Sequence, residues 1–189
     1  MDWEKAFDKV DQTKMIEAIY RLNIPEKMLR ILTAFYISPK FRIKDREGMS
    51  TFRKQRTGIR QGCPLSPYLF IILMTVLIAD VHEELGDTNI EPPDNISESE
   101  LLYADDTLLM TKDQDSMKNL VHAIEKISAE YNMKLNMDKC FHISMNCAPT
   151  IHFRNGQPMA AATQVTYLGG TITNKGCPRT EIQSRLSLV

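Results

Sequence analysis

The 189-residue sequence lacks the features that mark secreted and membrane-spanning proteins. Its four cysteines form no CxxC pair, and a chain of this length can bury enough apolar surface to fold without disulfides. The apolar run Tyr68–Ala79 has twelve residues, whereas about 20 are needed to span a bilayer. Asp2, Glu4 and Lys5 occupy the place where the apolar part of a signal peptide would begin. We therefore expect reduced thiols in an intracellular protein, nuclear or cytoplasmic, that does not enter a membrane.

The sequence also lacks a recognisable zinc-binding pattern. Two cysteines and two histidines could be grouped as a zinc site: Cys140, His142, Cys147 and His152. Their spacing fits no common ligand pattern, so structural thiols are the better interpretation.

A strong net charge is absent, but charge is segregated along the chain. The net charge is −1, from 23 Lys and Arg against 24 Asp and Glu. Residues 40–60 contain eight basic and two acidic residues, a balance of 8 − 2 = +6, whereas residues 80–106 contain ten acidic residues and no Lys or Arg. This pattern fits a surface that holds phosphates beside a site that holds cations. Two solvated faces without a partner explain such runs equally well.

The hydrophobic periodicity predicts a mixture of helices and short strands. Apolar residues recur at helical spacing over 15–22, 28–35 and 117–131, and the apolar segment 68–84 predicts a central helix. Asp115 or Ser116 is available to cap the helix over 117–131. Strand pairs are predicted at 41–44 with 51–54, at 101–104 with 107–110, and around the Asn155-Gly156 turn. This order of elements indicates an α+β fold.

Asp105 and Asp106 lie between two apolar strand-like runs, so a hairpin would carry both carboxylates at its tip. An Asp-Asp pair in a turn is usually turn chemistry alone. Here the apolar flanks make two charges costly unless cations compensate them. Asp2, at the end of a strand, could supply a facing ligand. Nucleotidyl transfer requires such carboxylates, because it uses two divalent cations about 4 Å apart.

Five blocks of the sequence resemble successive motifs of reverse transcriptases, in the order of that family. They are most similar to the enzymes of non-LTR, LINE-type retrotransposons, and they are Asp2–Asp8, Gly58–Pro67, Tyr103–Asp106, Leu135–Lys139 and Tyr167–Gly170. The resemblance implies one reverse transcriptase domain over 1–189. Its fold would be a right-hand polymerase palm, with an antiparallel sheet, packed helices and part of the fingers. Such a domain would add dNTPs to the 3′-hydroxyl of a DNA or RNA primer on an RNA template, using two Mg²⁺ ions that Mn²⁺ can replace.

The resemblance also implies roles for acidic and basic side chains. Asp2 and Asp105 would be the principal metal ligands, and Asp106 the weaker third carboxylate. Lys139 would protonate the departing pyrophosphate, although a solvated lysine is an equally good interpretation. Asp8 is expected to cap the following helix rather than to bind metal.

Other matching residues would contact the nucleotide and the nucleic acid. Phe7 would lie under the incoming sugar, and a core phenylalanine at a helix start is an equally good interpretation. Arg60, Gln61 and Gly62 would form a loop against the incoming nucleotide. A primer-holding hairpin is expected near 151–173, and further nucleic-acid contacts come from the basic hairpin; the residues concerned are Tyr167, Leu168, Gly169, Gly170, Arg53 and Lys54.

The first motif begins at the second residue, although a strand should precede its aspartate. We therefore expect a palm fragment truncated at both ends, with the remaining fingers, the thumb and an endonuclease supplied by a longer polyprotein. Two alternatives remain at this stage. One is a catalytically incompetent palm remnant that binds nucleic acid through the basic hairpin. The other is a two-metal nuclease, which has no need for the Gly58–Pro67 loop or for Phe7.

Overall fold

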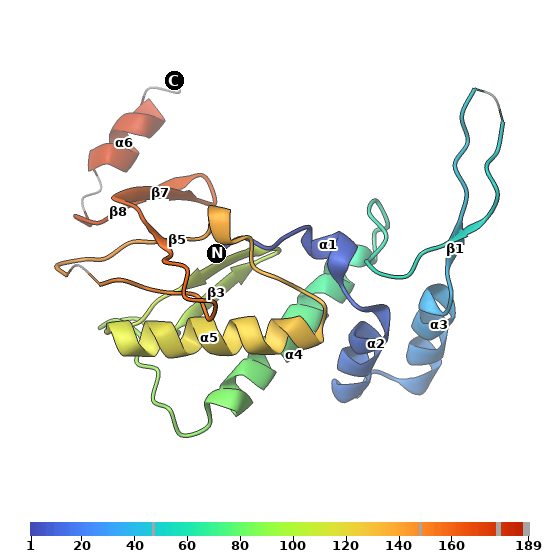
Figure 1. The fold of residues 1–189 in the computed structure, drawn as a ribbon, viewed down its shortest axis with the longest axis horizontal. Helices are drawn as coiled ribbons and strands as arrows, with labels where there is room; N and C mark the ends of the chain where they lie inside the picture. The colour runs from blue at the N-terminus through green and yellow to red at the C-terminus, as the bar shows by residue number, and fades with distance from the viewer. Residues whose placement is uncertain (47, 148, 177–178, 187–189) are drawn as a thin grey trace.

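The computed structural model describes residues 1–46, 48–147, 149–176 and 179–186 (Figure 1). Its helices are α1 (Ala6–Lys9), α2 (Gln12–Arg21), α3 (Glu26–Tyr36), α4 (Ser66–Leu85), α5 (Gln114–Glu130) and α6 (Arg179–Leu186), with a 3₁₀ turn η1 at Met137–Lys139. Its strands are β1 (Lys40–Phe41), β2 (Arg53–Lys54), β3 (Glu100–Tyr103), β4 (Asp106–Leu109), β5 (Phe141–His142), β6 (Ala160–Ala161), β7 (Gln164–Tyr167) and β8 (Gly170–Thr173). The mixed α+β composition predicted from the sequence is confirmed.

Helix α4 forms the centre of the fold, as its apolar sequence predicted. It packs against α5 on one side and α2 on another, and α2 in turn packs against α3. Leu73, Leu77 and Val81 of α4 are fully buried, as are Leu120 and Ile124 of α5. In the β3–β4 hairpin, Thr107 is buried whereas its neighbour Asp106 is exposed, so the hairpin has a packed face and an outer face.

Among the described residues, the assigned strands form four two-stranded pairs, whereas the resemblance implied an antiparallel sheet. β1–β2, β3–β4 and β7–β8 are antiparallel, whereas β5–β6 is parallel. Each of these strands has only two or four residues. The predicted hairpin region 151–173 is likewise divided: the Asn155-Gly156 turn joins segments linked by one His152–Pro158 bridge, and β7–β8 is a pair of its own.

Both predicted helix caps were wrong. Asp8 lies inside α1, and Asp11 caps α2 by accepting hydrogen bonds from the backbone N–H groups of Thr13 and Lys14 at 2.8 and 2.9 Å. The cap of α5 is Asp113, which accepts from Ser116 N at 2.8 Å. A capping residue needs extended backbone just before the first turn, and Asp11 and Asp113 have this conformation.

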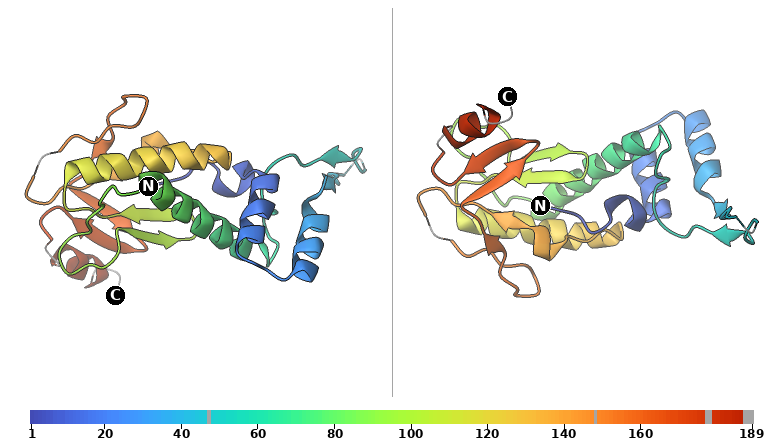
Figure 2. Two further views of the ribbon diagram at one scale, coloured as in Figure 1. Left: turned by 90° about the horizontal axis from the view of Figure 1, so that it is seen from below. Right: turned by 90° about the horizontal axis from the view of Figure 1, so that it is seen from above.

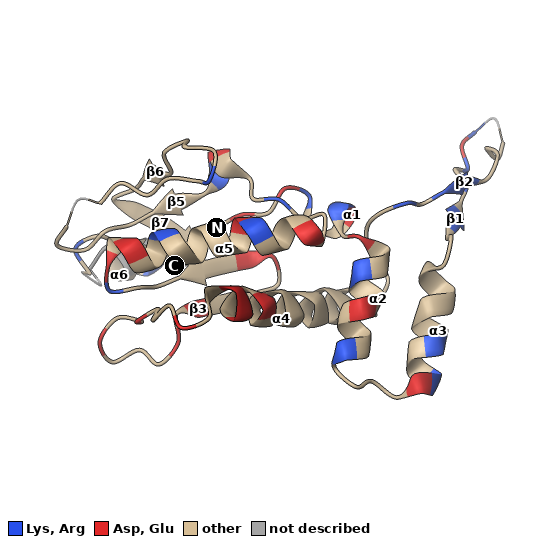
Figure 3. Cartoon of the chain, turned by 60° about the horizontal axis from the view of Figure 1, so that its bottom comes forward, with Lys and Arg blue, Asp and Glu red and all other residues tan. Residues whose placement is uncertain are grey.

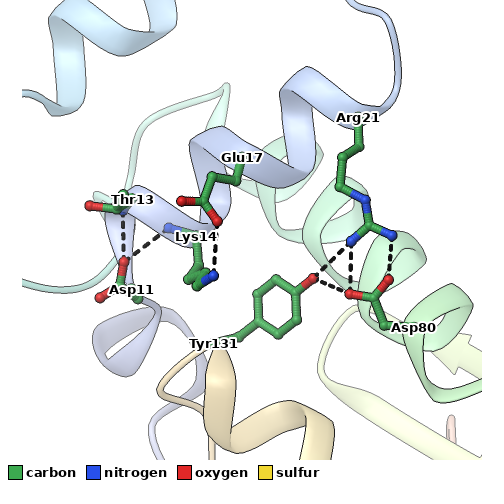
Figure 4. A network of polar contacts seen from close by, with 7 residues as sticks. All are labelled: Asp11, Thr13, Lys14, Glu17, Arg21, Asp80 and Tyr131. Atoms are coloured by element: carbon green, nitrogen blue, oxygen red, sulfur yellow. Dashed lines mark hydrogen bonds and ion pairs between the residues drawn. The ribbon is translucent and has the colours of Figure 1, made fainter. Parts of the chain in front are cut away.

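A polar network ties three helices together (Figure 4). Arg21 of α2 forms an ion pair with Asp80 of α4, and the hydroxyl of Tyr131, which follows α5, donates to Asp80 at 2.5 Å. The Arg21 guanidinium holds the pKa of Asp80 below its ordinary value, and the Tyr131 hydroxyl acts in the same direction. Burial raises the pKa of Tyr131, and its bond to Asp80 raises it further.

A slender hairpin, which we call the arm (residues 40–54), projects from the end of α3. Figures 1 and 2 show it at one end of the molecule, with β3–β4 and β7–β8 toward the other. All residues of the arm that the structure describes are exposed. Figure 3 shows basic residues (blue) on the arm and acidic residues (red) at the end of α4 and in the connection after it. The charge segregation seen in the sequence is therefore also a separation in space.

The cysteine and membrane expectations can be compared with the described residues. Cys63, Cys140 and Cys147 are free thiols, and Cys177 lies outside the described residues. No group of three or more His, Cys, Asp or Glu side chains in the described ranges could hold a metal ion. None of the described helices is both long enough and apolar enough to cross a membrane.

Candidate active site

The N-terminal segment Met1–Glu4 lies between the β3–β4 hairpin and the segment 134–136. On one side, Trp3 and Leu135 form an antiparallel bridge, with Glu4 N donating to Lys134 O at 2.8 Å. Asn136 N donates to Asp2 O at 2.9 Å, which continues this pairing. On the other side, Met1 pairs with β4. The segment thus acts as a short strand that places Asp2 next to the hairpin.

The register of this pairing puts Asp2 opposite Asp106. Met1 N donates to Thr107 O at 2.5 Å, and Thr107 N donates to Met1 O at 3.4 Å. This exchange marks a hydrogen-bonded antiparallel pair, so the next residues, Asp2 and Asp106, form a non-hydrogen-bonded pair, with Cα atoms about 4.5 Å apart in regular geometry. The indole N–H of Trp3 donates to Thr107 Oγ1 at 3.1 Å on the buried side. Because side chains alternate, Asp2 and Asp106 share the outer face.

The hairpin turn presents the two adjacent carboxylates to solvent. Tyr103 pairs with Asp106, which leaves Ala104 and Asp105 as a two-residue loop. Ala104 has a φ of +53°, a left-handed conformation that costs an alanine roughly 1 kcal/mol or more. Asp105 and Asp106 are both exposed. The apolar flanks therefore do not bury these charges, contrary to the expectation from the sequence, because the outer face of the hairpin is open.

The β7–β8 hairpin lies beside this outer face (Figure 2). Leu168 and Gly169 form its two-residue loop, with φ values of +49° and +77° that fit a type I′ turn. The hydroxyl of Tyr167 donates to Leu101 O of β3 at 3.4 Å. Burial raises the pKa of Tyr167, and the nearby Asp106 carboxylate raises it further. The charge of Asp106 therefore acts on the Tyr167 hydroxyl.

The Gly58 loop packs directly on the backbone of α1. A Cβ atom at Gly58 would lie 2.8 Å from Asp8 O and 2.9 Å from Phe7 O, and its φ of +87° is left-handed. Ile59 N donates to Phe7 O at 2.7 Å, and Gln61 Nε2 donates to the Asp8 carboxylate at 3.0 Å. The first and second sequence blocks are therefore joined through α1.

Phe7 is partly buried, and its ring stacks on Phe70 of α4 with centroids 4.7 Å apart. One face of the ring belongs to the core, as the alternative interpretation of Phe7 required. Gln61 and Gly62 are exposed in the same loop. Arg60 is also exposed, but its guanidinium donates to Phe35 O at 3.2 Å, which holds it toward α3.

Lys139 is exposed at the end of η1, three residues beyond the Asn136–Asp2 contact. Cys140, the next residue, is fully buried against Asp2: Asp2 N contacts its sulfur at 3.5 Å. Burial raises the pKa of the Cys140 thiol. The fourth sequence block therefore supports the Asp2 segment from the side opposite β4.

Sequence reasoning missed several supporting residues. Thr107, Trp3 and Cys140 hold the Asp2 segment, while Gln12 Nε2 and Gln55 Nε2 both donate to Gly58 O, at 2.9 and 3.2 Å. A polar Thr107 inside an apolar run was a signal for a buried hydrogen bond. The two glutamines carry no such signal, because nothing local distinguishes them from surface residues.

The carboxylates of this site are of the chemical type that binds divalent cations, but their side chains do not converge on one point. Three exposed or half-exposed carboxylates supply the hard oxygen ligands that such ions prefer: Asp2, Asp105 and Asp106. No group of three potential ligands is close enough to hold a metal within the part of the chain that is described. The backbone register alone brings Asp2 and Asp106 face to face.

Arg53 and Lys54 do not join this site. They lie on the arm, at the other end of the molecule from the carboxylate hairpin (Figure 1). Among the other predicted residues, Phe7 lies in α1 and Lys139 ends η1. The rest belong to the Met1–Glu4 segment, the Gly58 loop, the β3–β4 hairpin and the β7–β8 hairpin.

Comparison with known proteins gives the family. A sequence model described as "Reverse transcriptase (RNA-dependent DNA polymerase)" matches residues 1–172. This chain belongs to the reverse transcriptase family. The resemblance seen in the five sequence blocks is thereby confirmed.

The similar proteins come from retrotransposable elements. The chain is 27% identical to the Retrovirus-related Pol polyprotein from type-1 retrotransposable element R2 of Popillia japonica, over 93% of the chain and 30% of that protein. It is 26% identical to the R2 Pol polyprotein of Nasonia vitripennis, over 77% of the chain and 14% of that protein. It is 25% identical to the Transposon TX1 uncharacterized 149 kDa protein of Xenopus laevis, over 74% of the chain and 11% of that protein. This reverse transcriptase chain therefore spans less than a third of each of these relatives.

Proposed function

We propose that this chain carries an RNA-directed DNA polymerase site that extends the 3′-hydroxyl of a primer with dNTPs on an RNA template. The observation that carries the proposal is the pairing of Met1 with Thr107, which sets Asp2 opposite Asp106 on the open face of the hairpin. Asp2 and Asp106 are separated by more than a hundred residues, and only the fold brings them together. A site of facing carboxylates beside a turn suits chemistry on phosphate esters.

Each surrounding element has a role in this proposal. The Gly58–Gln61 loop, held on α1 by close backbone contact, would form one wall for the incoming nucleotide, with Phe7 beneath it. The β7–β8 hairpin, next to Asp106, would hold the primer end, and its glycines at 169 and 170 allow a backbone to approach closely. Lys139 is exposed and would donate a proton to pyrophosphate.

Asp2, Asp105 and Asp106 would hold the two divalent metal ions. When bound, such ions lower the pKa of the attacking hydroxyl and neutralise charge on the leaving group. The carboxylates themselves would bind and position the ions, and the turn at Ala104 and Asp105 places two of them at the tip of the β3–β4 hairpin. The acidic surroundings of residues 80–106 add a negative field that attracts cations.

Primer extension tests the proposal. The chain is incubated with an RNA template, an annealed primer, dNTPs and Mg²⁺, or Mn²⁺ in its place, beside the variants Asp105→Asn and Asp115→Asn. We expect metal-dependent synthesis by the unmodified chain. In Asp105→Asn the rate of synthesis should fall at least about a hundredfold, because the charge that develops in the transition state is less well stabilised. Asp115 is exposed in the first turn of α5, so Asp115→Asn controls for the loss of one surface charge.

Circular dichroism should show the same helix content in all three proteins. Equal synthesis by Asp105→Asn and the unmodified chain would contradict the assigned site. Absence of synthesis by the unmodified chain would overturn the proposal of a working site, while its family membership would stand on the sequence match.

A further inference from the structure

The packed side of the junction between the Met1–Glu4 segment and β4 contains a buried polar contact between side chains. The indole N–H of Trp3 donates to Thr107 Oγ1 at 3.1 Å, and the two residues are only 5% and 1% exposed. An indole N–H is a donor without acceptor capacity, so it stays unsatisfied in the interior unless an acceptor lies in front of it. The Thr107 hydroxyl therefore offsets the cost of burying the Trp3 N–H.

Backbone pairing alone does not select the register of this junction. An exchange of hydrogen bonds between Met1 and Thr107 joins the segment to β4, and the second of these bonds is long, at 3.4 Å. Each backbone offers the same N–H and C=O groups at every residue, so a shifted pairing would form equivalent bonds. Side chains must therefore decide which residues face each other.

A shift by one residue is excluded by burial. It would turn Asp2 to the packed side and Trp3 to the solvent, which buries a charge and exposes an aromatic ring. A shift by two residues keeps both side chains on their present faces. It would set Asp2 opposite Ala104 or Leu108 in place of Asp106. The alternation of polar and apolar residues thus permits a register in which the two carboxylates no longer meet.

The contact between Trp3 and Thr107 distinguishes these registers. By count, Trp3 lies opposite Asp105 and reaches diagonally to Thr107, two residues further along the chain. After a shift by two residues, this diagonal position would be taken by Leu109, which has no side-chain acceptor, or by Asp105, which is exposed in the turn. The hydrogen bond as observed is therefore specific to the present register.

We propose that the hydrogen bond between Trp3 and Thr107 fixes the register that sets Asp2 opposite Asp106. Trp3 and Thr107 are then positioning residues, because they act on the carboxylates through the backbone and touch no substrate. This role rests on the proposed function in one respect, that Asp2 and Asp106 bind divalent cations together. Without the Thr107 hydroxyl, the chain would populate more than one register, and only the fraction with facing carboxylates would bind the ion with full affinity.

NMR spectroscopy of the labelled chain measures the hydrogen bond and the register separately, without metal ions. Trp3 is the only tryptophan in the sequence, so the chain gives a single indole N–H signal, whose exchange with solvent reports on the bond to Thr107. The α-protons of a non-hydrogen-bonded antiparallel pair lie close together, so a nuclear Overhauser contact between Asp2 and Asp106 reports on the register.

Three variants are compared with the unmodified chain. Thr107→Val removes the hydroxyl and keeps a branched side chain, whereas Thr107→Ser keeps a hydroxyl. Thr75→Val is the control, because it removes an exposed hydroxyl that donates to Ile71 O within α4, away from this junction.

We expect a protected indole proton and a clear contact between Asp2 and Asp106 in the unmodified chain, in Thr107→Ser and in Thr75→Val. In Thr107→Val the indole proton should exchange at least about tenfold faster, and the contact should fall to about a fifth or less. An undiminished contact in Thr107→Val, or its loss in Thr107→Ser, would overturn the inference.

Mn²⁺ binding links the register to the proposed function. The free ion is measured by electron paramagnetic resonance, and Thr107→Val should bind Mn²⁺ at least about fivefold more weakly, in proportion to its loss of the Asp2–Asp106 contact. Equal affinity in Thr107→Val, despite a lost contact, would overturn the positioning role. Absence of Mn²⁺ binding by the unmodified chain would contradict the metal site of the proposed function instead, while the NMR contact alone decides the register.

Trp3→Phe tests the same bond from its other side and keeps an aromatic ring in the core. It remains informative where circular dichroism shows that Thr107→Val has lost its fold. Trp3→Phe should also weaken Mn²⁺ binding at least about fivefold, and the double variant with Thr107→Val should bind no more weakly than either single variant. Losses that add in the double variant would overturn the inference, because the two residues would then act independently.

Discussion

At the scale of single residues, Gly58 joins two segments that the sequence separates by fifty positions. Its backbone N–H donates to Val10 O at 2.7 Å, and its carbonyl accepts from the side chains of Gln12 and Gln55. With Asp8 O only 2.8 Å from the place of a Cβ, no other residue fits without a shift of backbone against backbone. The glycine is needed for close approach as well as for its positive φ.

Gly58→Ala should therefore destabilise the fold by roughly 1–3 kcal/mol, which thermal unfolding would measure. Gly62→Ala is the matched control, because Gly62 has a similar φ of +81° but nothing within 4 Å of its Cβ position. The control should lose clearly less stability than Gly58→Ala. Similar losses in both would show that the positive φ alone matters and that the contact with Asp8 does not.

At the scale of secondary-structure elements, helix starts depend on backbone conformation as well as on residue type. Asp115 or Ser116 was expected from the sequence to cap α5, whereas the structure uses Asp113. Asp113 has extended φ and ψ angles at the position before the first turn. The Ser116 hydroxyl also donates to the Asp113 carboxylate, at 2.6 Å. That contact lowers the pKa of Asp113 below its ordinary value.

Asp113→Ala should cost about 1 kcal/mol of stability, because the first turn of α5 loses its cap. Asp115→Ala removes an acidic residue from the same turn without removing the cap, so it should cost only a few tenths of a kcal/mol. Urea unfolding of both variants measures the difference. A larger loss in Asp115→Ala would contradict the assignment of the cap.

At the scale of the whole molecule, the Arg21–Asp80–Tyr131 network joins α2, α4 and α5 near the centre of the fold. The pKa of Asp80 is lower in the folded chain than in the unfolded chain, mainly because Arg21 donates to its carboxylate. A carboxylate with a depressed folded pKa stabilises the fold above its unfolded pKa of about 4, and this stabilisation is lost as the pH falls through the folded pKa.

Asp80→Asn should therefore lower the free energy of unfolding by about 1–2 kcal/mol near neutral pH. The difference from the unmodified chain should shrink as the pH falls below about 4. Urea unfolding over a pH series measures this, with Asp87→Asn as a control at an exposed position that forms no ion pair within the described residues. A pH-independent difference would show that Asp80 acts by packing and not by charge.

The helices and hairpins could be predicted because the spacing of apolar residues in the sequence matches the repeat of a helix or a strand. The apolar residues of α4 and α5, the hairpin around Asp105 and Asp106, and the five family motifs were all predicted, and the family match confirms the membership they implied. The solvent exposure of single residues was harder to predict from the sequence. The carboxylate pair was expected between apolar neighbours, yet both aspartates are exposed.

The family, the main helices and the residue types of the site could be read from the amino-acid sequence. Only the folded chain shows that Asp2 faces Asp106, that Gly58 lies against Asp8, and that Lys54 pairs with Lys40 and Arg53 with Phe41. Hydrophobic periodicity can be predicted because it depends on neighbouring residues. Strand register depends on hydrogen bonds between segments that are distant in the chain. A shift of one residue in that register would turn each side chain to the other face.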